Sequence, residues 1–534
     1  MGGRQRRAAA ADDKRRARAR HLGSCAVSVG LRDSSVYRLP FGRGQLEFAL
    51  PPSMRGTLLQ PKELPPLTAP AAAIRQAVAN PTGCAPLRQL ARPGDRVCLV
   101  FTDATRACPD ALLVPALLEE LHAAGVRDED ITLLCATGLH RPSTSAEKVA
   151  KLGASILERY RVVDHAALDS TQLAYLGTTA SGASIWINRL VIEADLVIAT
   201  GVVEPHLYAG YSGGPKTVAV GAAGEPTIAY THSIQLTDHP NTRLGCVEEN
   251  PFHQTLREIA HRARLRFILN VLLDGQERIL AVRAGDPEPA FRALVALARE
   301  LYEVPVDRQY DLVITGVGHP KDANLYQATR AATYVFRAPK PVLKPGGCII
   351  VPAPCPEGVG LGSGERRFYE IMRSADDMAT LLAELRRIGY PAGAQRAYFL
   401  AQVLRYHRVI IVGAENPDVV RHLHMTPART MEEALQGAVE EIGRSDLEVL
   451  IMPHALHTLP AEQGMEPLHV AVGTVRLQLR RHGQDPGSVD GQSALRILAE
   501  LSQEEPELPA SKWYTSAQPE QLAQFTELWE SLRH

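Results

Sequence analysis

An alternation of short apolar runs with helical stretches is the feature that most constrains the fold of this chain. A polar or glycine-rich turn separates each apolar run from the helical stretch after it. The apolar runs lie at residues 97–101, 131–135, 196–199 and 267–273, and again at 312–315, 347–351, 408–412 and 448–452. Strands that alternate with helices are typical of parallel sheets covered on both faces. The sequence therefore predicts an α/β fold.

The pattern is interrupted once, by a helical stretch at 290–302 followed by Pro305. We therefore expect two domains with mainly parallel sheets flanked by helices, and an active site between them. The predicted extents are 37–304 for an N-terminal α/β domain and 305–455 for a C-terminal α/β domain. We interpret 1–36 as a basic, disordered tail or an over-long gene start, with organelle targeting as an alternative. Residues 456–534 are interpreted as an extension of unknown role.

The composition argues against several classes of protein. The formal net charge is -1 at pH 7 and aromatic residues make up 5% of the chain, which disfavours a nucleic-acid binder. No apolar run approaches the roughly 20 residues that span a bilayer. The eight cysteines are scattered and lack Cys-x-x-Cys spacing, so we interpret them as reduced core residues. We expect a cytoplasmic enzyme for a small molecule, with no nucleic-acid or membrane partner.

Polar side chains follow the first three apolar runs at the point where each run ends. Asp103 and Arg106 follow the first run, His140 follows the second, and His206 follows the third. The carboxyl ends of parallel strands meet at one edge of a sheet, where ligands bind in open α/β folds. We therefore expect these four side chains to share one site.

The stretch 210–217, Gly-Tyr-Ser-Gly-Gly-Pro-Lys-Thr, places glycines before Lys216. Glycine turns of this kind cradle phosphates, because bare backbone amides can approach an anion closely. A P-loop, however, has glycine directly before its lysine, and Pro215 both breaks that pattern and removes an amide. The stretch by itself allows a phosphate loop, a structural turn or a covalent anchor at Lys216.

Histidines bracket this lysine. His206 lies ten residues before Lys216 and His232 lies sixteen residues after it, while His140 comes from another strand end. A lone histidine is more often a satisfied polar residue, but three around one lysine favour a site. Histidine serves as a general base near neutral pH or as a metal ligand.

Taken together, these motifs resemble those of the nickel-pincer lactate racemase family. The matching segments run in the family's order over 37–454. They are Asp-Ala-Thr-Arg at 103–106, Ala-Thr-Gly-Leu-His-Arg-Pro at 136–142, Glu-Pro-His at 204–206, the glycine stretch to Lys216, Tyr-Thr-His at 230–232, and Pro-Lys-Asp-Ala-Asn-Leu-Tyr-Gln at 320–327.

The resemblance implies a cofactor that contains nickel. This is pyridinium-3,5-bisthiocarboxylic acid mononucleotide, the nickel-pincer nucleotide, attached to Lys216 through a thioamide. The resemblance also implies that Ser212, Gly213 and Gly214 contact the cofactor and that His232 binds nickel. Separate cofactor maturation proteins are implied as partners.

The resemblance further implies that His140 and His206 are the two catalytic bases of a 2-hydroxyacid racemase or epimerase. One base takes the hydroxyl proton while a hydride passes from C2 to the cofactor, and a 2-keto acid forms that can take the hydride back on either face. A secondary alcohol donates hydride poorly until its proton leaves, which explains the need for a base. Arg106 suits the substrate carboxylate. We place Asp103 beside it in the substrate-binding set, where it orients a histidine or Arg106, with a simple structural role as the alternative.

Residues of the second domain are expected to select the substrate. Tyr326 and Gln327 match substrate-binding positions of the family. Two positions depart from the lactate enzyme, which has a lysine where this chain has Arg330 and a tryptophan where it has Gln395. An amide in place of an aromatic wall favours a substituent more polar than methyl. We therefore expect a larger or more polar 2-hydroxy acid, such as a dicarboxylic or sugar acid.

Three alternatives stay open on the sequence. The chain could be a lactate racemase itself, a P-loop-like nucleotide-binding phosphotransferase, or a non-catalytic carrier of the cofactor or metal. Loading of Lys216 without exchange of hydrogen at C2 would indicate a carrier, and ATP binding without an adduct would indicate a phosphotransferase. The sequence leaves the oligomeric state undetermined.

Overall fold

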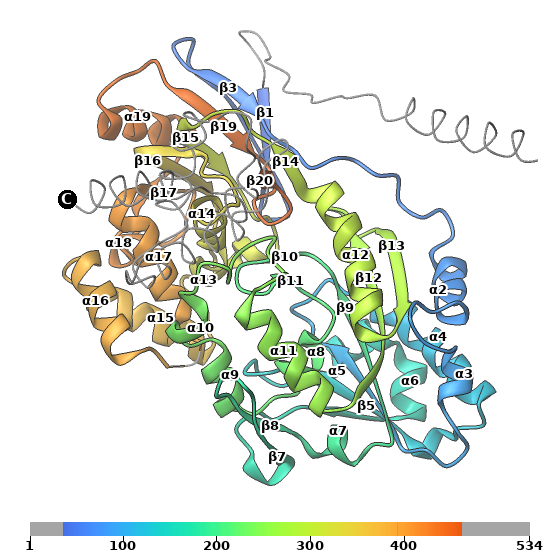
Figure 1. Ribbon diagram of the computed structural model, residues 1–534. Helices are drawn as coiled ribbons and strands as arrows, with labels where there is room; N and C mark the ends of the chain where they lie inside the picture. Colours follow the sequence, from blue (N-terminus) through green and yellow to red (C-terminus); the bar gives the residue numbers. More distant parts are fainter. Residues whose placement is uncertain (1–35, 392, 462–534) are drawn as a thin grey trace, which may run out of the picture.

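Two six-stranded sheets form the framework of the protein in the computed structural model, which describes residues 36–391 and 393–461 (Figure 1). The first sheet has the order β13-β12-β9-β4-β5-β6 and is parallel except for β13. Its strands are β4 (Val97–Thr102), β5 (Ile131–Ala136), β6 (Arg161–Asp164), β9 (Leu196–Val202), β12 (Leu265–Leu273) and β13 (Ile279–Gly285). The predicted α/β fold with mainly parallel sheets is confirmed.

The second sheet has the order β18-β17-β16-β15-β19-β3 and is parallel throughout. Its strands are β3 (Arg55–Leu58), β15 (Tyr310–Thr315), β16 (Leu343–Pro352), β17 (Arg408–Val412), β18 (Thr426–Ala428) and β19 (Glu448–Met452). All eight apolar runs predicted as strands lie in strands of these two sheets.

The strands of the first sheet send alternate side chains into two cores, as the period of a strand requires. In β4, Leu99 and Phe101 point to one core, and Cys98 and Val100 point to the other. Helices cover both faces, which explains why the strand is apolar throughout. On the first face lie α2 (Pro70–Ala79), α4 (Asp110–Ala123) and α5 (Ser145–Leu152), and on the second lie α8 (Lys216–Ala219), α11 (Pro251–Arg262) and α12 (Pro287–Tyr302).

The second sheet is covered in the same way, and its inner core is continuous with that of the first. Val313 of β15 and Ile349 of β16 belong to the same buried cluster as Val100. The helices on this side are α14 (Arg330–Phe336), α15 (Ser363–Arg373), α16 (Met378–Ile388) and α17 (Gln395–Tyr406). The outer face packs against α19 (Met431–Ile442) and the hairpin of β1 (Val36–Phe41) and β2 (Gly44–Ala49). The two halves of the molecule are therefore packed together.

Two short strands depart from the predicted division of the chain. β3 was assigned to the N-terminal domain, but it pairs with β19 at the edge of the second sheet. β20 (Leu459–Ala461) lies beyond the last predicted strand and pairs with β14 (Glu303–Pro305). Pairing across long sequence separations decides both positions. The predicted tail at 1–36 lies outside the described residues except for its last residue, and the predicted extension lies outside them from residue 462.

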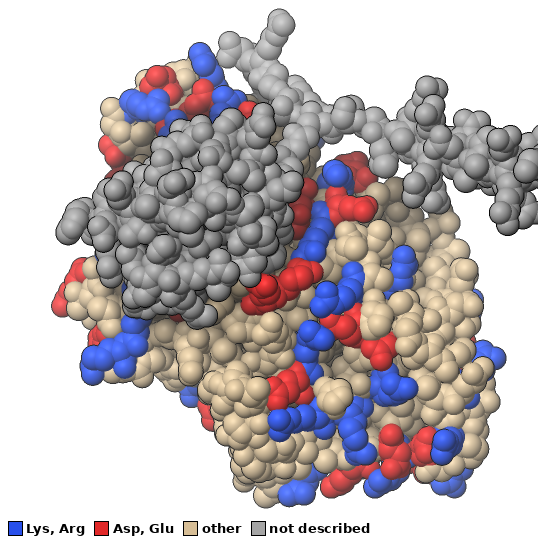
Figure 2. Space-filling model, viewed as in Figure 1, with Lys and Arg blue, Asp and Glu red and all other residues tan. Residues whose placement is uncertain are grey.

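The described surface carries charges of both signs. On the face in Figure 2, Lys and Arg side chains are interspersed with Asp and Glu side chains, in keeping with a formal net charge of -1 for the chain. None of the helices in the described residues is long and apolar enough to cross a membrane.

Candidate active site

Loops at the carboxyl ends of β4, β5 and β9 form one side of the candidate site. These three strands are neighbours in the first sheet, so the loops after them meet at one edge. The loop after β9 forms the hairpin of β10 (Pro205–His206) and β11 (Gly210–Tyr211), which lies between the two sheets in Figure 1. The second domain faces this edge with α13 (Leu325–Ala328) and α14.

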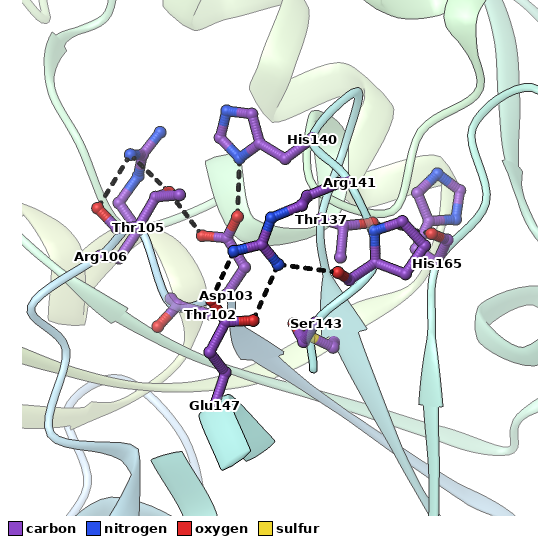
Figure 3. A network of polar contacts seen from close by, with 12 residues as sticks. Thr102, Asp103, Thr105, Arg106, Thr137, His140, Arg141, Ser143, Glu147 and His165 are labelled. Carbon is purple, nitrogen blue, oxygen red and sulfur yellow. Dashed lines mark hydrogen bonds and ion pairs between the residues drawn. The ribbon is translucent and has the colours of Figure 1, made fainter. Parts of the chain in front are cut away.

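Asp103 holds His140 in a fixed orientation (Figure 3). The Nδ1 atom of His140 lies 2.6 Å from Oδ2 of Asp103, and Oδ1 accepts a hydrogen bond of 2.7 Å from Thr105. Burial alone would raise the pKa of Asp103, but the hydrogen bond and charge of His140 lower it to about 2. An ionised carboxylate only accepts, so Nδ1 of His140 donates and Nε2 is the ring nitrogen that Asp103 leaves unoccupied.

Two hydrogen bonds to other loops fix the loop that carries His140. Thr137 donates through Oγ1 to the carbonyl of His165 at 2.7 Å, as Figure 3 shows, and the amide of Gly138 donates to the carbonyl of Gly221 at 3.0 Å. Gly221 follows α8, the helix that begins at Lys216. These hydrogen bonds bring the histidine loop to the segment that carries the lysine.

A buried ion pair supports the loop of Arg106, and the sequence analysis missed it. Lys151 of α5 lies 2.9 Å from the carboxylate of Asp110, a residue with no exposed surface. The same ammonium donates to the carbonyls of Arg106 and Cys108 at 2.9 and 2.8 Å. Lys151 thus sets the path of the backbone that presents Arg106. Only its position in the fold reveals this role, because nothing in the sequence pairs residue 151 with residue 110.

The glycine turn before Lys216 is a tight structural support. Gly213 and Gly214 have φ of +80° and +55°, and a Cβ at Gly214 would lie 2.8 Å from the ring of Phe291. Only glycine adopts this conformation readily in so little space. The amide of Gly214 donates to Oδ1 of Asn270 at 2.7 Å, which fixes the turn to β12. Asn270 is a second supporting residue that the sequence analysis missed.

Most amides of this turn already have protein acceptors. Those of Ser212, Gly214 and Lys216 donate to protein groups, and Pro215 has no amide hydrogen to give. The hydroxyl of Ser212 donates to the carbonyl of Val202 at 2.7 Å. These hydrogen bonds fix the turn that carries Lys216, and the geometry disfavours a P-loop.

Lys216 and His206 are in direct contact. Nζ of Lys216 lies 2.5 Å from Nε2 of His206, and Nδ1 of His206 accepts hydrogen bonds of 3.2 Å from the amides of Tyr208 and Ala209. A neutral imidazole that accepts at Nδ1 carries its proton on Nε2. Nε2 therefore donates to the lysine nitrogen, which requires an unprotonated amine.

Burial and nearby positive charges favour the neutral forms of both Lys216 and His206. Burial, with the charges of Arg106 and Arg330, lowers the pKa of Lys216 well below its usual value. Burial, with the charges of Lys216 and Arg330, does the same to the pKa of His206. A neutral amine is nucleophilic, so Lys216 is suited to form a covalent bond with an acyl or thioacyl group.

His232 presents one ring nitrogen to the same region. It follows α9 (Glu225–Thr231), and its Nδ1 lies 3.0 Å from the carbonyl of Ile228, to which it donates. Nε2 therefore keeps a lone pair. Burial and the charge of Lys216 lower the pKa of His232 to about 4, so the ring is neutral at pH 7. A buried, neutral imidazole fixed at Nδ1 is suited to bind a metal ion through Nε2.

A metal ion at this place would need further ligands from another molecule. Among residues 36–391 and 393–461, no group of three or more His, Cys, Asp or Glu side chains is arranged to hold a metal ion. Within this site, the amine of Lys216 and Nε2 of His232 are the groups that could hold a cofactor and its metal.

The second domain adds positive charge to the site. Arg330, at the start of α14, donates to the hydroxyl of Tyr334 at 2.9 Å, and Tyr334 donates to the carbonyl of Pro205 at 3.2 Å. Lys321, which the sequence analysis did not single out as a site residue, is buried close to Glu204, whose charge opposes the lowering of the lysine pKa by burial. Glu204 also lies 3.6 Å from His457. Charged groups of both domains therefore meet around the Glu-Pro-His segment.

Three further predicted residues lie at the start of helices in the second domain. Tyr326 donates through its hydroxyl to the carbonyl of Gly393 at 3.0 Å and packs edge-on against Phe368. The backbone amide of Gln327 donates to Asn324, the cap of α13. Gln395 begins α17, and its side-chain oxygen is buried without a hydrogen-bond partner. The contacts place Tyr326 and Gln395 beside the same loop and give Gln327 a backbone role only.

Comparisons with known proteins agree with this geometry. The family model of the lactate racemase N-terminal domain matches residues 41–245, and that of the lactate racemase C-terminal domain matches residues 306–459. A lactate racemase from Thermoanaerobacterium thermosaccharolyticum is 32% identical over 429 residues, which cover 80% of this chain and 99% of that protein. A lactate racemase from Lactiplantibacillus plantarum is 34% identical and covers 72% of this chain and 89% of its own length.

A solved structure extends the comparison to three dimensions. The lactate racemase apoprotein from Thermoanaerobacterium thermosaccharolyticum superposes with a TM-score of 0.72 at 31% identity, over 80% of this chain and 100% of that one. The two domain models, the two relatives and the solved structure all match this chain over most of the described residues. The chain therefore belongs to the lactate racemase family of isomerases.

Proposed function

We propose that this protein is a nickel-dependent racemase or epimerase of a 2-hydroxy acid more polar than lactate. One observation carries the proposal: three histidines of the site each have Nδ1 held by a protein group, so that each presents Nε2, and one of them, His206, contacts Lys216. Asp103 holds His140, two backbone amides hold His206, and the Ile228 carbonyl holds His232.

The nickel-pincer nucleotide is the cofactor that these residues would hold. Lys216 supplies the nitrogen for its thioamide bond and His232 supplies a ligand to the nickel. When bound, the cofactor provides an acceptor for the hydride of C2. Proteins that assemble and attach this cofactor are part of the proposal, as is a cytoplasmic location, which the free cysteines of the described residues favour.

The side chains of the protein provide proton transfer and binding. Nε2 of His140 has a lone pair and takes the proton of the C2 hydroxyl, which makes C2 a better hydride donor. His206 is the second group that exchanges a proton at the C2 oxygen. Arg106 and Arg330 bind the carboxylate of the substrate, because the charges of both guanidinium groups act on His206 and on Lys216.

Mass spectrometry and nickel analysis of the intact protein test the proposal. The protein is produced in a host that makes the cofactor, and Lys216→Ala is produced in parallel as the control. We expect a mass increase and bound nickel in the wild type only, and inversion of C2 in at least one member of a panel of 2-hydroxy acids that includes lactate. An unmodified Lys216 without nickel would overturn the proposal, and preference for lactate over every larger acid would overturn its substrate class.

A further inference from the structure

Several buried polar atoms near the histidines have no hydrogen-bond partner. They are Oη of Tyr208, Oε1 of Gln395, and Nε and Nη1 of Arg396. Buried polar groups are nearly always paired in folded proteins, because an unpaired one loses its hydrogen bonds to water without compensation. Unpaired atoms that gather at one place therefore point to a ligand.

Tyr208 connects these atoms to the site. Its ring centroid lies 5.5 Å from that of His206, 5.7 Å from that of His232 and 5.0 Å from that of Phe399 in α17. Gln395 and Arg396 occupy the first turn of α17, about one turn before Phe399. Burial raises the pKa of Tyr208, and the charge of Arg396 partly offsets that rise, which places the guanidinium near the phenol.

Arg396 interacts with the side chain of Tyr326, near which the charge of Glu365 also acts, but its Nε and Nη1 atoms are left without partners. Its guanidinium lies 5.0 Å from the ring centroid of Tyr326, and it forms no ion pair with the described part of the chain. An aromatic face attracts a cation but does not satisfy its N–H donors. The unpaired set thus contains two donors on Arg396 and the hydroxyl of Tyr208, against one acceptor on Gln395. A ligand rich in acceptors and negatively charged matches this set.

Arg396 and Arg330 are held at different places. Arg330 donates to the hydroxyl of Tyr334, which in turn donates to the carbonyl of Pro205, the residue before His206. The guanidinium of Arg396 instead lies over the ring of Tyr326, whose hydroxyl donates to the carbonyl of Gly393. Arg396 therefore marks an anion position separate from that of Arg330.

We propose that Arg396 and Tyr208, with Gln395 beside them, bind a second carboxylate at the end of the substrate remote from C2. The substrate is then a 2-hydroxy dicarboxylic acid. Guanidinium and phenol groups both donate to carboxylate oxygens, and the carboxamide of Gln395 can present either its oxygen or its NH₂. The inference rests on the proposed function, since it concerns the substrate of the same site.

The substitution Arg396→Gln in the cofactor-loaded enzyme tests this subsite. Malate, a 2-hydroxy dicarboxylic acid, and lactate are compared by chiral analysis of turnover and by calorimetric titration of binding. We expect the wild type to prefer malate, and Arg396→Gln to raise the KM and Kd for malate by about tenfold or more while those for lactate change little. Arg396→Lys should restore part of the loss, and Arg405→Gln, an exposed arginine of the same helix, is the matched control.

The other outcomes separate the two proposals. If Lys216 is loaded but no hydroxy acid is inverted, the proposed function fails. If lactate or an uncharged polyhydroxy acid is preferred to malate, or if Arg396→Gln affects malate and lactate equally, the second-carboxylate subsite is overturned and the proposed function stands. If Arg396→Gln lowers the loaded fraction of Lys216 in the intact mass spectrum, the guanidinium binds the cofactor's phosphate and the subsite is again overturned.

Discussion

The histidines and the lysine of the candidate site differ from the polar residues at the start of α17 in how completely their side chains are paired. In the half built on the first sheet, His140, His206 and His232 are each held through Nδ1, and Lys216 is held by His206. In the half around α17, Arg396 and Gln395 have buried atoms without partners. Groups that take part in bond making benefit from a fixed orientation, whereas groups that bind a ligand remain unpaired until it arrives. This contrast assigns the histidines and Lys216 to the reaction and the residues of α17 to substrate binding.

Removal of Lys216 should abolish the function of the paired part of the site. We expect Lys216→Ala to lose all detectable turnover, because no other side chain in contact with His206 provides an amine. Intact mass and nickel content measure the loss directly and do not depend on the substrate. The exposed Lys62→Arg serves as the control, and retention of the mass increase in Lys216→Ala would show that the attachment point lies elsewhere.

Removal of one fixed base should have a smaller effect. His140→Ala is expected to lower kcat by about 10²–10⁴-fold, the usual contribution of a positioned general base, while Lys216 is still loaded. Steady-state kinetics with the preferred acid measure the change, and the intact mass confirms loading. A rise in KM with kcat unaltered would show that His140 binds the substrate and is not a base. The contrast between the two parts of the site would then be lost.

The sequence predicted the half of the site that depends on strand ends. Asp103, His140 and His206 follow apolar runs, and the geometry of parallel sheets is enough to bring such residues together. The sequence left open whether Asp103 orients a histidine, orients Arg106 or has a simple structural role, and the structure places it 2.6 Å from His140. The glycines before Lys216 also predicted a tight turn correctly, because the backbone conformation of a turn depends mainly on its own residues.

The rest of the site depends on contacts between distant segments. Lys151 and Asn270 support loops that they do not adjoin in sequence, and the side chain of Arg396 was indistinguishable from a surface arginine in the linear pattern. Pro215 already argued against a phosphate cradle, and the acceptors that bind the amides of Ser212, Gly214 and Lys216 became visible only in the structure. β3 is four residues long, mostly polar and at a sheet edge, so its pairing with β19 has no periodic signal. Tertiary pairing, and not local propensity, determines all of these.

The smallest expected effect concerns acid stability and sharpens the contrast at Asp103. The pKa of this carboxyl is lowered to about 2 from an ordinary value of 3.8. Its ionised form therefore stabilises the folded protein above pH 4, and the stabilisation is lost as the pH falls from about 4 towards 2. The difference corresponds to about 2 kcal/mol at neutral pH. Urea unfolding of wild type and Asp103→Asn at pH 7 and pH 3 measures it.

The pH dependence is more informative than the absolute stability, because asparagine can keep part of the hydrogen bonding to His140. We expect the wild type to lose more unfolding free energy than Asp103→Asn between pH 7 and pH 3. Equal losses would mean that the carboxylate is not held in its ionised form by His140, and the orientation of Nε2 would then lack its electrostatic cause. Gln395 carries no charge that titrates, so its substitution should leave the acid transition unchanged.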